Sequence, residues 1–488
     1  MKACVILLAL ILTFNLTAAP KPRVIHLIDI GKYPHLPETD KKDPDDKQSL
    51  VRALLYSNEM DIEGLIATAS WTGISFTNSQ QGVFPESIIA AVDAYAKVLD
   101  NLIVHDKGWP SAEYLRRVIK KGNPAGSVPF WSGNHMDVVG DGKDTEASAH
   151  ILARILADDP RHLWFCVWGK SIDLAQALWN LRRDYSSKVE EITGKLLVYD
   201  IAGQDACGAW IAGTFPRIKW HRATYSVISW ANVLASINNV GDLSVITRDW
   251  WNGNVIRFGI MGKLYPIKTH EGNWEGDTPS FLPFIDRGLS DHRSLHSGGW
   301  GGRYLQDPTA NMPALMEGIS KFQIQYEPFL MHEPAGDTWS YNGNAYVNDK
   351  RVPIGRFRTA IQNDFAARMQ WTVSAIYSKA NHPPTAIIND FAGREFIYLT
   401  VGPGQKVELT ARGSSDPDSD KLSFQWWRYA EADSYDGNIS IHHPTSMDAH
   451  FLAPDAPGKN IHMILEISDN GIPVLKSYRR IIVTIADK

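Results

Sequence analysis

Cysteine is scarce in this sequence. Of three cysteines among 488 residues, Cys4 stands before an apolar N-terminal run, which leaves Cys166 and Cys207 for the rest of the chain. Two cysteines form no more than one disulfide bridge, and neither has the surroundings of a catalytic nucleophile. A bridge and two buried thiols are both compatible with the sequence.

Clusters of basic residues and long apolar runs are also missing. The 49 lysines and arginines are outnumbered by 54 acidic residues, so the formal net charge is -5. A nucleic-acid-binding surface requires clustered Lys and Arg, and a transmembrane helix requires about 20 apolar residues in succession. These absences argue against a nucleic acid polymer as partner and against membrane insertion. They indicate a globular protein, whose length favours two or three domains.

The first 19 residues predict a cleaved signal peptide. A positively charged start precedes an apolar run at residues 5–12, and small residues stand before Pro20. The run is too short to span a bilayer, so we expect removal rather than anchoring. The mature protein is therefore expected to be secreted or periplasmic.

Short apolar segments alternate with helical patterns over residues 20–382. Residues 23–30 and 62–69 predict buried strands, and residues 47–60 between them carry leucines at helical spacing. This order predicts parallel strands with a right-handed crossover. The continued alternation predicts an α/β domain with a mostly parallel sheet flanked by helices. Further helices are expected at residues 86–101, 111–120, 145–157, 174–183 and 356–378, and further strands at residues 163–168 and 195–201.

A change of period marks a second domain at residues 383–488. Asn381 and His382 are followed by two prolines, which stop the preceding helix because proline cannot continue one. Strands of period two are then expected at residues 406–410, 422–427, 462–467 and 477–485. Short strands at this spacing predict an immunoglobulin-like β-sandwich.

Acidic side chains gather after the first predicted strand. Asp29 ends that strand, and Asp40, Asp43, Asp45 and Asp46 follow. Ligands of parallel α/β sheets bind where the strands end, and oxygen ligands favour Ca²⁺ or Mg²⁺ over Zn²⁺. A cation would also relieve the repulsion between carboxylates that converge there. The alternative is structural, because Asp just before a helix is favoured as an N-cap and by the helix dipole.

Segments along the chain resemble the nucleoside hydrolases. Residues 45–50 (DDKQSL), the helix after them and residues 61–68 (DIEGLIAT) are similar to the opening unit of those enzymes, which carry an Asp-x-Asp-x-x-x-Asp-Asp loop. A set of exported, nucleoside-hydrolase-like, cellulose-binding proteins is more similar still. Residues 167–169 with 174–178, 203–205, 275–282, 298–304, 362–368 and 380–382 resemble that set.

The resemblance implies roles for individual residues. Asp46, Asp277 and the main-chain carbonyl of Ile172 match positions that hold Ca²⁺, with Asp29 as a further candidate ligand, and Asp45 would lie close to the sugar. The residues expected around the substrate are Ser70, Trp71, Asp205, Glu275 and Trp300, although tight turns among the glycines around Trp300 also explain that tryptophan.

Several positions depart from the related patterns. Lys170, Ile172 and Asp173 stand where the related proteins usually have small or amide residues, and Ala206 follows Asp205 where a second Asp is common. The enzymes have an Asp, as ligand and general base, four residues before the paired Asp, where this sequence has Lys41 in a longer loop. Asp29, Asp40 and Asp43 are each able to replace the missing carboxylate. We take Asp43 and Asp45 as the catalytic candidates.

Aromatic residues of the predicted sandwich are candidates for carbohydrate binding. Trp426 and Trp427 are adjacent on one strand and so face opposite sides, one toward the core and one outward. The outward one, with Tyr429, would stack on a glucan ring. A spacer that packs on the first domain is the alternative. The Asp-rich loop at residues 414–420 is either a Ca²⁺ loop or an ordinary turn.

Two functions are compatible with these residues. In the first, the protein is a metal-assisted hydrolase of glycosidic bonds, of the N-ribosyl type by resemblance. Ca²⁺ would hold the vicinal hydroxyls of a sugar or nucleoside-like molecule, and a loop Asp would activate water. In the second, the cleft binds a sugar without cleaving it, and the sandwich docks the chain on a polysaccharide such as cellulose. Fold alone does not distinguish them.

Overall fold

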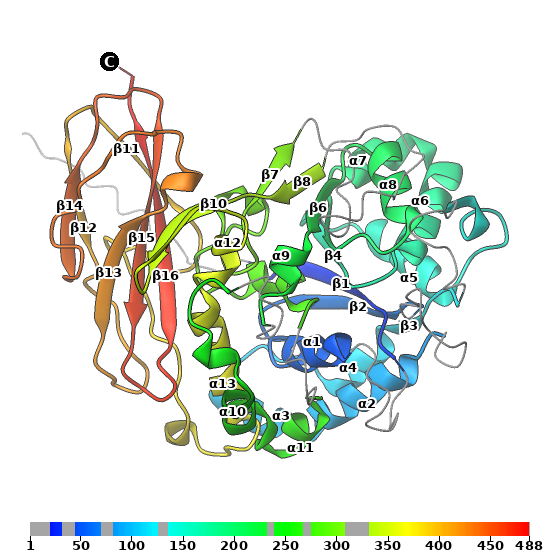
Figure 1. Ribbon diagram of the computed structural model, residues 1–488. Coiled ribbons are helices and arrows are strands. Elements are labelled where there is room, and N and C mark those ends of the chain that lie inside the picture. The colour runs from blue at the N-terminus through cyan, green and yellow to red at the C-terminus, as the bar shows by residue number, and fades with distance from the viewer. Residues whose placement is uncertain are drawn as a thin grey trace, which may run out of the picture.

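The computed structural model describes residues 20–31, 44–69, 82–124, 135–231, 239–266, 275–307 and 331–487. Figure 1 shows a helix-covered sheet beside a β-sandwich. The predicted signal peptide lies outside the described residues. In this part of the chain, none of the helices has both the length and the apolar character that a membrane span requires.

Eight of the strands in the described residues form the sheet of the larger domain, in the order β3-β2-β1-β4-β5-β6-β8-β7. Neighbouring strands from β3 to β8 run parallel, and β7 at the edge runs antiparallel to β8. The predicted α/β fold is confirmed. The strands are β1 (Arg23–Ile28), β2 (Asp61–Ala67), β3 (Ile119–Lys121), β4 (Leu163–Val167), β5 (Leu196–Ile201), β6 (Lys219–Ala223), β7 (Tyr304–Asp307) and β8 (Met331–Pro334).

The strands are apolar on both sides because helices cover both faces of the sheet. In β1, Val24 and Ile28 belong to one hydrophobic cluster, whereas Ile25 and Leu27 belong to another. This division follows from the alternation of side chains along a strand. The first cluster includes α1 (Asp45–Leu54), α2 (Pro85–Ala96) and α13 (Arg358–Trp371); the second includes α5 (Glu146–Ile155), α6 (Ile172–Asp184) and α8 (Ala206–Thr214).

The two cysteines beyond the N-terminal segment are free and buried. Cys166 belongs to the first cluster and Cys207 to the second. Because the sheet separates the two clusters, the thiols lie on opposite faces of it and form no bridge.

Several helices are shorter than their sequence patterns predict. Residues 86–101 begin as α2 but continue into a separate α3 (Leu99–His105). Residues 111–120 form only α4 (Ala112–Arg117), because β3 after it pairs with β2. The last helix, α13, ends at Trp371. The remaining helices are α7 (Val189–Thr193), α9 (Tyr225–Ile228), α10 (Arg248–Trp251), α11 (Gly259–Leu264) and α12 (Val352–Gly355).

The C-terminal part is a β-sandwich. A four-stranded sheet, β11-β16-β15-β13, faces a two-stranded sheet, β12-β14. All four segments of period two form strands, and one side of each contributes to a separate hydrophobic core. The strands are β11 (Ile397–Val401), β12 (Lys406–Thr410), β13 (Ser423–Arg428), β14 (Asp448–Leu452), β15 (Asn460–Ser468) and β16 (Lys476–Ile485); a hairpin of β9 (Asp337–Tyr341) and β10 (Asn344–Asp349) precedes them.

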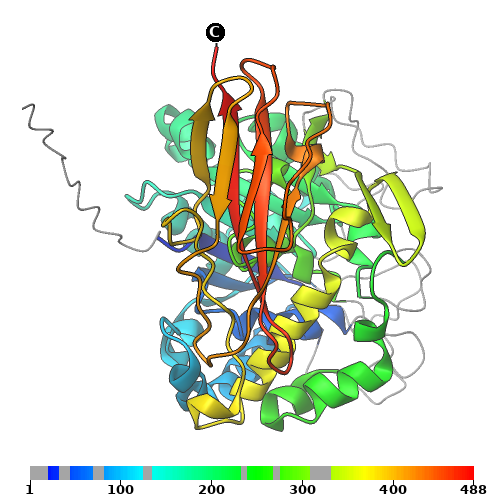
Figure 2. The same ribbon diagram turned by 90° about the vertical axis from the view of Figure 1, so that its left-hand side faces the viewer.

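The sandwich packs directly on the larger domain. Figures 1 and 2 show its four-stranded sheet beside the yellow helix α13. Tyr429 and Tyr478 of the sandwich belong to the same hydrophobic cluster as α1 and α13. The guanidinium of Arg480 donates to the carbonyl oxygens of Ser297 and Gly298 at 2.8 and 3.1 Å. Apolar and polar contacts together therefore hold the two domains against each other.

Candidate functional site

Three carboxylates meet beside the carboxyl end of β1. One oxygen each of Asp45, Asp46 and Asp277 lies within 4.8 Å of the others. Asp45 and Asp46 open α1, whereas Asp277 comes from a segment far later in the chain. Asp29, which follows β1, shares a side-chain hydrogen bond with Asp46. The fold thus brings together four of the acidic residues that the sequence singles out.

The two aspartates of α1 do not cap that helix. Its N-cap is Pro44, which forms no side-chain capping bond, and both aspartates belong to the first helical turn. The helix dipole favours negative charge there. Asp46 and Asp277 are 2% and 3% exposed, and Asp45 is half-buried. Burial of adjacent carboxylates is costly unless positive charge balances them, so this cluster is suited to a cation.

Two glycines give these carboxylates their space. A Cβ at Gly276 would lie 2.7 Å from Oδ2 of Asp45, and a Cβ at Gly169 would collide with the carboxylate of Asp29. Both glycines lie in segments that carry the family resemblance, but their spatial role was not predicted. Their lack of a side chain lets neighbouring backbone approach the acidic cluster.

Burial dominates the electrostatics of Asp29. It raises the pKa of that carboxyl to about 6, although the hydrogen bond with Asp46 and the charge of Lys170 oppose the rise. Lys170 is itself buried, its pKa is lowered by burial, and its Nζ donates to the carbonyl oxygen of Gln204 at 2.7 Å. Lys170 thus supplies positive charge from the β4–α6 connection.

Glu275 was expected to face a substrate, and the structure corrects that expectation. Its side chain is completely buried. Nε of Arg52 donates to one carboxylate oxygen at 2.8 Å, and the hydroxyl of Tyr265 donates to the other at 2.6 Å. Both oxygens therefore have partners inside the protein, and Glu275 anchors the segment that carries Asp277.

Asp205 and Ile172 stand at the starts of two helices. Asp205 is the N-cap of α8, and one of its oxygens accepts from the N–H groups of Cys207 and Gly208. The other accepts from the N–H of Ser171 at 2.6 Å. A substrate contact is therefore not what this carboxylate provides. Ile172 is the first residue of α6, where a carbonyl oxygen normally accepts from the N–H four residues later, and its role as a cation ligand stays a prediction.

The aromatic residues proposed for carbohydrate binding are occupied within the protein. Trp426 is 1% exposed and lies in the sandwich core. Tyr429 is completely buried and donates its hydroxyl proton to Asp337 at 2.6 Å. Trp427 faces the opposite side from Trp426, as predicted, but it packs under the guanidinium of Arg356, 4.4 Å from the ring centre. Trp427 is half-buried there, so the larger domain covers part of the face that was expected to meet a glucan.

The remaining predicted site residues divide into two groups. Trp300 is completely buried and packs edge-to-face on Tyr478, so it belongs to the contact between the domains and does not face a sugar. Asp43, Ser70 and Trp71 lie outside the described residues.

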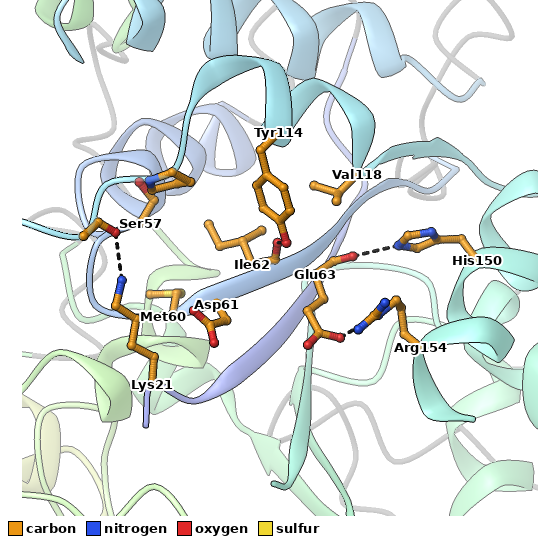
Figure 3. Close-up of a pocket in the computed structure, with 12 residues that line it drawn as sticks. Lys21, Ser57, Met60, Asp61, Ile62, Glu63, Tyr114, Val118, His150 and Arg154 are labelled. Atoms are coloured by element: carbon orange, nitrogen blue, oxygen red, sulfur yellow. Dashed lines mark hydrogen bonds and ion pairs between the residues drawn. The ribbon is translucent and has the colours of Figure 1, made fainter. Parts of the chain in front are cut away.

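A separate pocket of about 460 Å³ opens at the other end of β1 and β2 (Figure 3). Its polar groups are paired with one another. Glu63 accepts from Nε of Arg154 at 2.8 Å, and the imidazole of His150 contacts the carbonyl oxygen of Glu63 at 2.7 Å. Tyr114 donates to the carbonyl oxygen of Ile62. The pocket begins where the strands start, so it is distinct from the acidic cluster.

Comparisons with known protein families match both parts of the chain. Residues 36–304, more than half of the chain, match the family described as "Cellulose-binding Sde182, nucleoside hydrolase-like domain". Residues 406–485 match "Cellulose-binding protein Sde0182, C-terminal domain". A search of curated proteins found no match.

Among solved structures, the chain is similar to a nucleoside hydrolase-related protein from Saccharophagus degradans that is associated with carbohydrate metabolism. The two are 35% identical, with a TM-score of 0.77, over 96% of this chain and 100% of the other. A PKD domain from the protein KIAA 1837 covers 19% of this chain and 82% of its own at 20% identity, but its TM-score of 0.15 supports no argument.

Proposed function

We propose that this chain, which belongs to the cellulose-binding Sde182 family with a nucleoside hydrolase-like domain, is a cation-assisted hydrolase of glycosidic bonds. The proposal rests on the carboxylate oxygens of Asp45, Asp46 and Asp277, which lie within 4.8 Å of one another. The likeness to nucleoside hydrolases favours a bond of the N-ribosyl type. The substrate would be a sugar or nucleoside-like molecule, encountered by a secreted or periplasmic protein.

The cluster fits Ca²⁺ in donor type, charge and size. All three side chains offer carboxylate oxygens, the donors that Ca²⁺ prefers. Ligands on opposite sides of a Ca²⁺ ion, each about 2.4 Å from it, are about 4.8 Å apart. The oxygens of Asp45, Asp46 and Asp277 all lie within that separation. These residues would hold the ion, and Asp29 would orient Asp46 through their shared hydrogen bond.

The differing exposure of the carboxylates suggests their roles. A bound cation would supply positive charge that orients sugar hydroxyls and favours deprotonation of a nearby water. Asp45, the half-buried member, accepts the proton of that water, with Asp43 as the second candidate for this step. The buried Asp46 and Asp277 stabilise the positive charge that develops on the sugar in an oxocarbenium-like transition state.

A second function, sugar binding without cleavage, is favoured by the state of Asp29. Its carboxylate is buried, packs against Gly169 and is bonded to Asp46, so it is poorly placed to accept a proton from a substrate water. In this alternative the protein binds a polysaccharide such as cellulose and holds a sugar in a cleft that no longer cleaves it.

Release of reducing sugar from nucleosides and nitrophenyl glycosides, with Ca²⁺ or with a chelator, distinguishes the two functions. We expect Ca²⁺-dependent turnover of at least one substrate and its loss in the Asp46→Asn and Asp277→Asn variants. Asp141→Asn is the matched control, because Asp141 has an 88% exposed side chain. No turnover on the panel, together with retained Ca²⁺ binding and cellulose pull-down, would leave the binding function.

A further inference from the structure

One face of α1 lies along the segment that carries Asp277. Asp45, Gln48, Ser49 and Arg52 follow one another at i, i+3, i+4 and i+7, so they lie on the same side of the helix. Residues 275–278 pack against this side. The spacing places Asp45 at one end of the contact and Arg52 at the other.

Successive residues of the segment contact this face. The N–H of Glu275 donates to the side-chain oxygen of Gln48 at 3.2 Å. Gly276 lies against the carboxylate of Asp45. The hydroxyls of Thr278 and Ser49 are 3.1 Å apart. The helix that supplies two carboxylates of the cluster thus also binds the backbone and side chains on both sides of the third.

Arg52 contacts the segment through an ion pair and is itself held in place by other residues. Its guanidinium is completely buried and forms an ion pair with Glu275 at 2.8 Å. A second group of contacts joins Arg52 to α13. Its Nη2 donates to the side-chain oxygen of Gln362 at 2.7 Å, and its guanidinium lies 3.8 Å from the centre of the Phe365 ring. Arg52 therefore connects the Asp277 segment to two helices.

Glu275 adopts a backbone conformation that needs such support. Its φ of 41° lies in the left-handed region, which side chains other than glycine rarely occupy. The Trp230 indole N–H donates to its carbonyl oxygen at 3.0 Å, and Tyr265 bonds its side chain. The turn at Glu275 directs the chain so that Asp277, two residues later, reaches Asp45 and Asp46.

We propose that Arg52 and Glu275 are positioning residues that set the separation between Asp277 and the two aspartates of α1. This inference rests on the proposed cation site and goes beyond it, because neither residue contributes an oxygen to the cluster. Cation affinity then depends on a buried ion pair whose own members do not bind the cation. A purely structural pair would affect stability without affecting affinity.

Calorimetric titration with Ca²⁺ alone tests the proposal on the full chain. Arg52→Met and Glu275→Gln are compared with Arg303→Met, which removes another buried arginine, 5% exposed, from its 2.7 Å pair with Asp337. All variants are titrated well below their melting temperatures. We expect the first two to bind Ca²⁺ at least about 10-fold more weakly, as is typical when the support of a metal ligand is lost, and the third to bind as the wild type does.

The outcomes separate the positioning role from the proposed function. If Arg52→Met does not fold, the nearly isosteric Glu275→Gln decides the question, because it keeps the size of the side chain while removing its charge and one of its two acceptor oxygens. Wild-type affinity in folded Glu275→Gln would overturn the positioning role while leaving the cation site intact. A wild-type protein that fails to bind Ca²⁺ would overturn the cation site and the positioning role together.

Discussion

Replacement of Gly276 by alanine should weaken the cation site while leaving the fold nearly unchanged. The new Cβ would lie 2.7 Å from Oδ2 of Asp45, and its next neighbours are 3.8 Å away. Carbon–oxygen contacts normally begin at about 3.3 Å, so the carboxylate must retreat by roughly 0.6 Å. Sites for metal ions tolerate about 0.2 Å in ligand distance. We therefore expect Ca²⁺ affinity to fall about 10- to 100-fold, the range found when support around a ligand is disturbed.

Stability should change little, because two effects of the Gly276→Ala substitution oppose each other. An off-rotamer Asp45 would cost about 0.5–1.5 kcal/mol, whereas alanine in place of glycine restricts the unfolded chain and contributes about 0.4–1 kcal/mol. Gly253→Ala is the matched control, since nothing lies within 4 Å of the added Cβ. Titration calorimetry measures affinity, and thermal melting without Ca²⁺ measures stability. A folded Gly276→Ala protein that binds Ca²⁺ within twofold of wild type would show that the carboxylate of Asp45 need not lie beside Gly276 for the ion to bind.

Three further predictions concern metal removal, pH and the contact between the domains. Ca²⁺ at 100 times its Kd should stabilise the native state by about 2.7 kcal/mol; the melting temperature should fall on chelation, and Asp277→Asn should show no Ca²⁺-dependent shift. Burial raises the pKa of Asp173 to about 6, above an unfolded value of about 3.9. As pH rises from 4 to 6, the unfolded state therefore loses its proton first, and the contribution of Asp173 to the free energy of unfolding falls by up to roughly 3 kcal/mol. Asp173→Asn should therefore gain melting temperature relative to wild type over that interval, and a pH-independent difference would contradict the assignment. Tyr429→Phe removes a buried 2.6 Å hydrogen bond to Asp337 and should destabilise the protein by about 1–3 kcal/mol in thermal melts, with unchanged cellulose pull-down; a loss of pull-down in the folded variant would restore Tyr429 as a carbohydrate contact.

Local patterns of apolar and polar residues predicted most of the fold. Apolar runs such as residues 23–30 are buried on both faces, which only a helix-covered parallel sheet provides, and the change to period two after His382 marked the sandwich strands. Helix ends were harder to predict, because strand pairing decides them. Residues 119 and 120 belong to the predicted helix 111–120 but pair with β2 instead.

The candidate site was only partly accessible from sequence. Resemblance brought Asp46 and Asp277 into one hypothesis, and the fold places them together. The pairing of Glu275 with Arg52 depends on a turn with positive φ and on contacts between distant segments, which no local pattern encodes.

The sandwich aromatics illustrate the same limit. Alternation correctly separated Trp426 from Trp427, but it could not show that the larger domain covers the outward face, because that packing involves Arg356 from another part of the chain. Burial between domains is a tertiary property that accounts for Trp427 and Tyr429, whereas Trp426 lies in the core of the sandwich itself.

A crystal structure of the protein with bound Ca²⁺ would show whether Asp45, Asp46 and Asp277 share one ion. The anomalous signal of the ion locates it without reference to any assumed site. We expect one ion with oxygens of Asp45, Asp46 and Asp277 within about 2.3–2.6 Å of it. An ion bound elsewhere, or no ion between these carboxylates at saturating Ca²⁺, would contradict the proposed cation site.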